Sequence, residues 1–176
     1  MTYRTFKWIY GILASALALS FFGHGAWAAF ENKESFRELL SGTMNNVFGA
    51  STSIDDGAIS AAVRAIGWWD IVFAVGILAL AYGVIKGHGA LFRVASSPVA
   101  LVAYSWALLW GFLTAGSRVT AAGVFYPEVW DVVERGPNFI VPVAMLYMTY
   151  LLRRPSQLIE REEVPAEEKL QEAPTV

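Results

Sequence analysis

Six polar residues lie within or beside long apolar stretches of this 176-residue chain. They are one histidine, two carboxylates, two arginines and one asparagine: His24, Asp70, Arg118, Glu134, Arg135 and Asn138. Side chains of these types donate and accept hydrogen bonds, so together they can hold the polar head of a small molecule. An ionisable group in an apolar segment costs free energy unless it pairs or faces a polar interior. These six residues are the candidate ligand-binding site, and no catalytic residue is assigned.

His24 stands between Gly23 and Gly25, and the same Gly-His-Gly triplet returns at residues 87–89. The glycines allow close approach of a ligand to His24, although close packing of helices is the commoner reason for them. The two triplets are predicted at opposite membrane faces, so they do not share a site, and a haem held by both histidines is excluded. The chain has no cysteine, which removes disulfides and thiolate ligation. No metal site is predicted.

Apolar helices must position these residues. Hydrophobic residues make up 56% of the chain and charged residues only 16%, with the charges segregated into short stretches. This pattern predicts an all-α integral membrane protein: a four-helix bundle with an extra amphipathic helix in the first extracytoplasmic loop. The transmembrane domain is predicted over residues 1–154, with spans at about 8–30, 67–86, 98–120 and 133–152.

Two of the predicted spans leave alternatives open. The first follows Arg4 and Lys7 and contains Ala26-Trp27-Ala28, which has the form of a signal-peptide cleavage site. Its length favours a retained membrane helix. The last apolar run, residues 138–152, is short and contains Pro142, so this helix must begin near residues 131–135 or be kinked and locally buried.

The polar segment after residue 30 predicts a helix of its own. Its apolar residues recur at helical spacing, at 36, 39/40, 44 and 47/48, which indicates an amphipathic helix lying on the membrane surface or capping the bundle. After the turn residues at 51–57, a second short helical stretch is predicted over 58–66, leading into the next span.

Basic residues set the predicted orientation. Three segments contain bases and no acids: Arg4 and Lys7, Lys86 and Arg93, and Arg153 and Arg154. The positive-inside rule therefore predicts that both termini are cytoplasmic, in the inner membrane of a bacterium. Residues 155–176 are acidic and poor in apolar side chains, which predicts a disordered cytoplasmic tail. The expected partners are the lipid bilayer and other membrane subunits, and no nucleic-acid partner is predicted.

This orientation places all six candidate residues in the outer leaflet, and two interpretations of them stay open. In the first they are charges that reach the headgroups and have no further role. In the second they line a polar pocket for an amphipathic ligand such as a quinone, whose tail lies against apolar helix faces. The expected ion pairs are Asp70 with Arg118, and Glu134 with Arg118 or Arg135.

Several short motifs resemble those of the DoxX-like family of small four-helix membrane proteins. They are Phe-Phe-Gly-His-Gly-Ala-Trp-Ala at residues 21–28, the loop helix that follows, Arg118 near the end of the third span, and the segment 129–142. The resemblance covers roughly residues 8–154 and implies a four-helix bundle. Some members are membrane subunits of thiosulfate:quinone oxidoreductase or partners of redox enzymes. No catalytic residue of the family can be assigned to a position here.

Two functions are expected from these observations. The first is a non-catalytic membrane subunit or accessory protein of a larger complex, with a quinone or lipid pocket in the outer leaflet. The alternative is a quinone-reactive oxidoreductase subunit, in which His24 donates a hydrogen bond or carries a proton, Asp70 accepts a proton and Arg118 holds an anion. A transporter is disfavoured because no inverted repeat is visible.

Overall fold

The protein is all-helical. The computed structural model describes residues 2–48, 55–122 and 135–154. Helices make up 92% of these residues, and no strand occurs among them. Glu134 and the predicted tail at 155–176 lie outside the described residues.

The first helix, α1, spans Tyr3–Ala26 and begins at a side-chain cap, where the Thr2 hydroxyl accepts a hydrogen bond from the Thr5 amide at 3.2 Å. It continues without a break into a π-helical turn, η1, at Trp27–Glu31. Asn32 then stops the helix in a left-handed conformation, with φ of 48°. The Ala26-Trp27-Ala28 triplet therefore lies inside continuous helix, and α1 begins five residues before the predicted span at residue 8.

The next two helices follow separate capping signals. Helix α2 spans Glu34–Phe48. Helix α3 spans Asp56–Lys86 and starts where the Asp55 carboxylate accepts a hydrogen bond from the Ala58 amide at 3.1 Å. It ends at Gly87, whose φ of 75° closes the helix. Helix α3 thus joins the predicted short helix at 58–66 to the span predicted from 67. Gly67 lies within this helix and does not interrupt it.

The second half of the chain contains a short turn helix and two long ones. Helix α4 spans Gly89–Ala95, helix α5 spans Pro98–Ala122, and helix α7 spans Gly136–Leu152. The sequence did not predict α4. Pro142 lies buried inside α7, as expected for a proline that neighbouring helices shield.

Among the residues that the structure describes, three helical segments are long and apolar enough to cross a membrane: Tyr3–Glu31, Asp56–Lys86 and Pro98–Ala121, with mean hydropathies of 1.4, 1.9 and 1.6. Helix α7 is apolar but shorter. Large apolar side chains cover the outward faces of the long helices, including Ile12, Leu19, Val72, Val102, Phe112 and Val143. A surface of this kind is stable in lipid and not in water, so the chain is a helical membrane protein.

The long helices pack as two pairs, α1 with α3 and α5 with α7, and α1 also contacts α7. Glycines permit the closest crossings, because a Cβ on Gly67 would lie 2.4 Å from the Ala29 amide nitrogen, and one on Gly111 would lie 2.5 Å from the Asn138 carbonyl oxygen. At the other end of α1, the buried hydroxyls of Tyr10 and Tyr104 bond at 2.9 Å and join α1 to α5.

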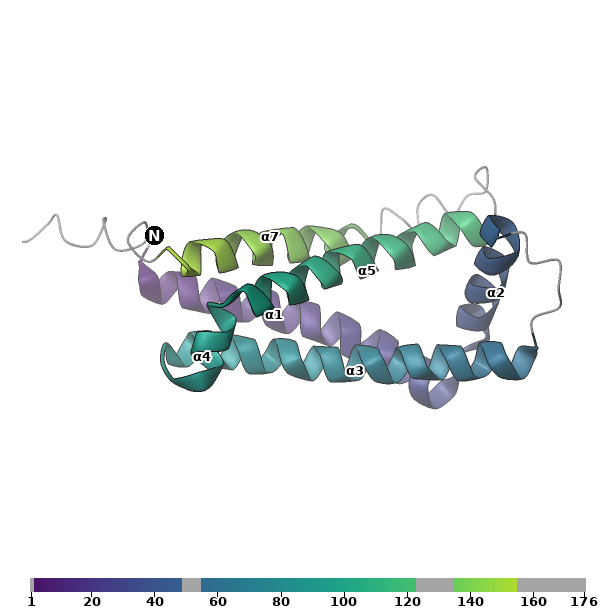
Figure 1. Cartoon of the computed structure of the whole chain (residues 1–176), viewed down its shortest axis with the longest axis horizontal. Coiled ribbons are helices and arrows are strands. Elements are labelled where there is room, and N and C mark those ends of the chain that lie inside the picture. Colours follow the sequence, from purple (N-terminus) through teal and green to yellow (C-terminus); the bar gives the residue numbers. More distant parts are fainter. Residues whose placement is uncertain (1, 49–54, 123–134, 155–176) are drawn as a thin grey trace, which may run out of the picture.

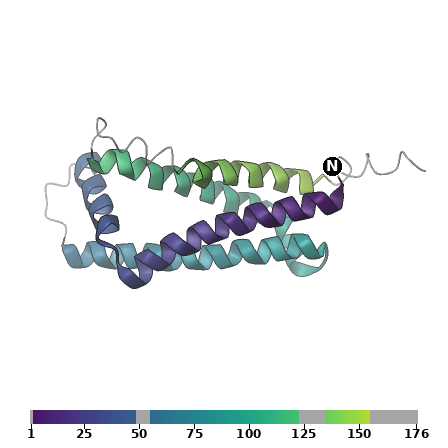
Figure 2. The same ribbon diagram turned by 180° about the vertical axis from the view of Figure 1, so that it is seen from behind.

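The two pairs separate toward one end of the molecule. Helix α1 runs diagonally from the side of α7 to the side of α3, and α2 crosses the space that opens between the pairs (Figures 1 and 2). Helix α4 and the N-terminus lie at the opposite end (Figure 1). This arrangement places the chain's polar cavity beneath α2.

Candidate functional site

A cavity of about 290 Å³ lies between the helix pairs, beneath α2. Its lining comes from α1, α2, α3, α5 and the start of α7. Five of the six candidate residues line it: His24, Asp70, Arg118, Arg135 and Asn138. The sixth, Glu134, lies outside the described residues. Four segments far apart in the sequence thus bring their polar residues to one space.

His24 connects α1 to the start of α7. Its Nδ1 lies 2.8 Å from the Ser20 carbonyl oxygen, and its Nε2 lies 3.0 Å from an Arg135 guanidinium nitrogen. A carbonyl only accepts and a guanidinium only donates. These two partners therefore assign the imidazole proton to Nδ1, and Nε2 accepts a hydrogen bond from Arg135. His24 in this state positions the arginine at the cavity wall.

A second polar link lies one helical turn along α1. The Ser20 hydroxyl donates a hydrogen bond to the Asn138 side-chain oxygen at 3.1 Å. The side-chain nitrogen of Asn138, Nδ2, makes no hydrogen bond within the described part of the chain. Its two N–H groups are therefore available at the cavity. The close crossing at Gly111 brings this part of α7 against α5.

Asp70 is the least satisfied polar residue of the lining. Its side chain is buried, with 5% exposed, and its Oδ1 has no hydrogen-bond partner among the residues that the structure describes. The Trp110 side chain lies next to its carboxyl group. The predicted ion pair with Arg118 is wrong, because no ion pair joins Asp70 to Arg118 in the described ranges. Arg118 lies two helical turns beyond Trp110 on α5, toward the end that α2 covers.

The two arginines supply the cationic part of the cavity. Arg118 enters from α5 and Arg135 from the residue before α7. Both also interact with other groups of the protein. Because a guanidinium carries five N–H donors, one such interaction leaves further donors for a ligand oxygen.

Helix α2 covers the cavity with its apolar side, through Phe36, Leu39 and Leu40. The sequence predicted this helix either on the membrane surface or capping the bundle, and in the structure it contacts α3 and α5. The helical spacing of residues 36, 39 and 40 was the signal. Sequence reasoning missed Ser20 and Trp110 as members of the site, because neither residue stands out in an apolar helix.

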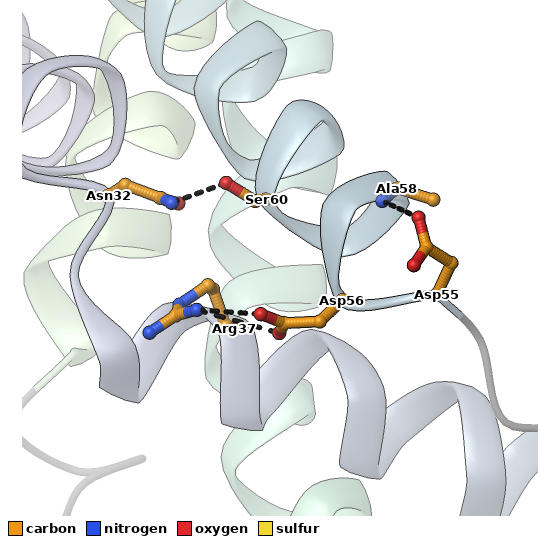
Figure 3. A network of polar contacts seen from close by, with 6 residues as sticks. All are labelled: Asn32, Arg37, Asp55, Asp56, Ala58 and Ser60. Atoms are coloured by element: carbon orange, nitrogen blue, oxygen red, sulfur yellow. Dashed lines mark hydrogen bonds and ion pairs between the residues drawn. The ribbon is translucent and has the colours of Figure 1, made fainter.

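Polar contacts fasten both sides of α2. On the α5 side, the Asn46 amide donates to the carbonyl oxygens of Thr120 and Ala121 at 2.8 and 3.1 Å, and the hydroxyls of Thr43 and Thr120 bond at 3.0 Å. On the α3 side, Arg37 pairs with Asp56 at 3.2 Å (Figure 3).

The Asn32 amide bonds the Ser60 hydroxyl on α3, just before α2 begins (Figure 3). This bond lies close to the left-handed turn that ends η1. The direction of the chain into α2 is thus set by the same helix, α3, that carries Asp70.

The fold and this site together define a helical membrane protein with a covered polar cavity near one end. Hydrogen-bond donors come from Arg118, Arg135 and Asn138, and the unpartnered acceptor is Asp70. Aromatic and aliphatic side chains make up most of the rest of the cavity lining. Comparisons with known protein families, curated proteins and solved structures found no match.

Proposed function

We propose that this chain is an accessory subunit of a bacterial inner-membrane complex and that it binds the head of a quinone in the cavity beneath α2. In this proposal α1, α3, α5 and α7 form a transmembrane four-helix bundle of the DoxX-like type. Helix α2 is the amphipathic helix at its outer end. The 17 residues of α7 rise about 26 Å, close to the hydrocarbon thickness of about 30 Å.

Charge distribution supports the orientation. The end that carries α4 holds six bases, and no acid among the described residues lies with them: Arg4, Lys7, Lys86, Arg93, Arg153 and Arg154. The end that carries α2 mixes acids with bases, as in Arg37 and Asp56. The positive-inside rule then puts the α4 end in the cytoplasm and the cavity in the outer leaflet.

The observation that carries the proposal is the chemistry of the cavity lining. A quinone ring has two oxygens on opposite sides and two apolar faces. Arg118, Arg135 and Asn138 offer donors to such oxygens, and Trp110 and Phe36 offer aromatic surface to the ring. At about 290 Å³ the cavity is at the lower limit for ligand sites, about 300–1,000 Å³, so it suits a head group alone.

A second candidate is a quinone-reactive subunit of the thiosulfate:quinone oxidoreductase type. It is favoured by the presence of two groups that can exchange protons, His24 and Asp70, in one cavity. In this case a partner subunit supplies the electrons. Reduction of a quinone by the purified complex, dependent on His24, would support this candidate over the accessory one.

The first prediction tests binding of the head. Full-length protein in mild detergent is titrated with a quinone that lacks a tail, and the affinity is measured by calorimetry. His24→Ala removes the acceptor that holds Arg135, and we expect the affinity to fall about tenfold or more, since hydrogen bonds to charged groups contribute about 1.5–3 kcal/mol.

The matched control is His88→Ala, because this other histidine is exposed at the α4 end, where its Nδ1 contacts the Lys86 carbonyl. We expect it to bind as the wild type does. The proposal is wrong if the wild type shows no binding, or if the two variants lose affinity equally.

A further inference from the structure

A second hollow, of about 280 Å³, lies on the outer face between α3 and α5. It is lined only by apolar and aromatic residues, among them Trp69, Phe73, Gly76, Leu80 and Val99. Several of its walls face outward, toward the lipid. Val99, for example, is 61% exposed. We call this hollow the α3–α5 groove.

A row of three tryptophans separates the groove from the cavity. Trp110 lines the cavity and stacks on Trp106, with ring centroids 5.8 Å apart. Trp106 meets the edge of Trp69 at 6.4 Å, and Trp69 lines the groove. Asp70 lines the cavity from the position next to Trp69. The two hollows therefore share one wall, built from indole rings.

One polar atom in this wall has no partner. The indole nitrogen of Trp106 is buried and donates no hydrogen bond within the described part of the chain. An unpartnered buried N–H costs free energy, so a ligand oxygen beside the row would satisfy it. Asp70 presents a second unpartnered atom, its Oδ1, close to the same row. A ligand that carries both a hydrogen-bond acceptor and a donor beside the row would satisfy both atoms.

The direction from cavity to groove suits an amphipathic ligand. The groove follows α3 from Trp69 to Leu80, away from α2 and toward the α4 end. In the proposed orientation this path leads from the outer leaflet toward the centre of the bilayer. A ligand whose head lies in the cavity would thus place its tail at a depth where the surroundings are hydrocarbon.

We propose that the α3–α5 groove binds the polyprenyl tail of the quinone whose head occupies the cavity, with the tail leaving past the tryptophan row. This inference rests on the proposed function. The tryptophan row runs from the lining of the cavity to the lining of the groove, and one apolar groove beside this row fits a molecule with one tail. A diacyl lipid would require a second path.

The experiment compares two quinones with the same head, one without a tail and one with two prenyl units, on the full-length chain in the same detergent. Detergent already shields the tail from water, so its contacts in the groove contribute packing alone. We therefore expect the tailed quinone to bind about fivefold to tenfold more tightly to the wild type.

Gly76→Leu fills the groove. A Cβ at Gly76 would meet no atom within 4 Å, so the substitution does not disturb the fold. We expect the preference for the tail to disappear while the affinity for the tail-less quinone stays unchanged. Ala103→Leu, from the α5 wall of the groove, should act in the same way. Val75→Leu is the matched control, because this residue also lies on α3, is 58% exposed and lines neither the groove nor the cavity.

The outcomes separate the two proposals. If the tail-less quinone fails to bind the wild type, the proposed function is wrong. If it binds but Gly76→Leu and Val75→Leu keep the same preference for the tail, the inference about the groove is wrong. It is equally wrong if Gly76→Leu releases a co-purified diacyl lipid without changing that preference, since the groove then belongs to membrane lipid.

Discussion

Asp70 and His24 line the same cavity but differ in how their polar atoms are satisfied. Both ring nitrogens of His24 have protein partners, Ser20 and Arg135. Asp70 keeps one oxygen buried without a partner. An unsatisfied buried acceptor lowers stability, and proteins keep such groups chiefly where they serve binding or chemistry. Among the residues that line the cavity, Asp70 most clearly indicates a ligand.

Replacing Asp70 separates stability from binding. We expect Asp70→Leu to raise the free energy of unfolding by about 1–3 kcal/mol, because it removes a buried group whose acceptor is unpartnered. The affinity for the reduced, hydroxyl-bearing form of the quinone should fall about tenfold, since that hydroxyl loses its acceptor. Thermal denaturation in detergent and calorimetry measure the two effects. Asp70→Asn, which keeps a buried polar group, should gain no stability. A loss of stability in Asp70→Leu would contradict the prediction.

The sequence predicted which of these residues lie near one end of the bundle, but not what they contact. Counting positions along each apolar run places Asp70 and Arg118 near one membrane face. Contact also depends on the depth at which two helices cross. That depth follows from the close approach of Gly67 to η1, and no feature of either residue indicates it. The proximity of Asp70 to Trp110 could therefore not be predicted from the sequence.

Helix α2 is the element that closes the cavity, and it is held mainly by contacts with α5. Thr43 and Asn46 bond α5, whereas Arg37 and Asp56 form an ion pair near the surface, which contributes little. Helix α2 is thus held more firmly by α5 than by α3. If it opens, we expect α2 to separate from α3 first.

Removing the Asn46 side chain should loosen α2. Asn46→Ala deletes two hydrogen bonds to the end of α5, each contributing about 1 kcal/mol. We expect amide hydrogen exchange over residues 34–48 to become about thirtyfold faster, because the free energy of local opening sets this rate. The neighbouring Asn45→Ala is the control, since Asn45 is exposed. Equal exchange in the two variants would mean that Asn46 does not hold the helix.

Long apolar helices were the most predictable elements. Helix α3 ends at Lys86, just before Gly87, and α5 begins at Pro98, so a glycine and a proline mark these two helix ends. The start of α3 was less predictable. Gly67 suggested a boundary, but α3 continues through it to the cap at Asp55. The π-helical turn after Ala26 depends on packing against α3, so no local sequence pattern predicts it.

The whole molecule is asymmetric along its long axis. One end holds only basic charges among the described residues. Helix α4, the start of α1 at Tyr3 and the end of α7 at Leu152 also lie at this end. The other end holds α2, the cavity and the mixed charges. Lipid-facing side chains surround the part between these ends. An asymmetry of this kind suits a protein inserted in one direction.

The orientation can be measured because the chain has no cysteine, so a single introduced thiol is the only reactive one. Glu38 on α2 and His88 beside α4 are both exposed and lie at opposite ends of the molecule. With a maleimide that cannot cross membranes, we expect spheroplasts carrying Glu38→Cys to be labelled directly, whereas His88→Cys is labelled only after the membrane is permeabilised. The cysteine-free parent controls for background. The reverse pattern would invert the orientation, and labelling of both sites in intact spheroplasts would show that the long helices do not cross the membrane.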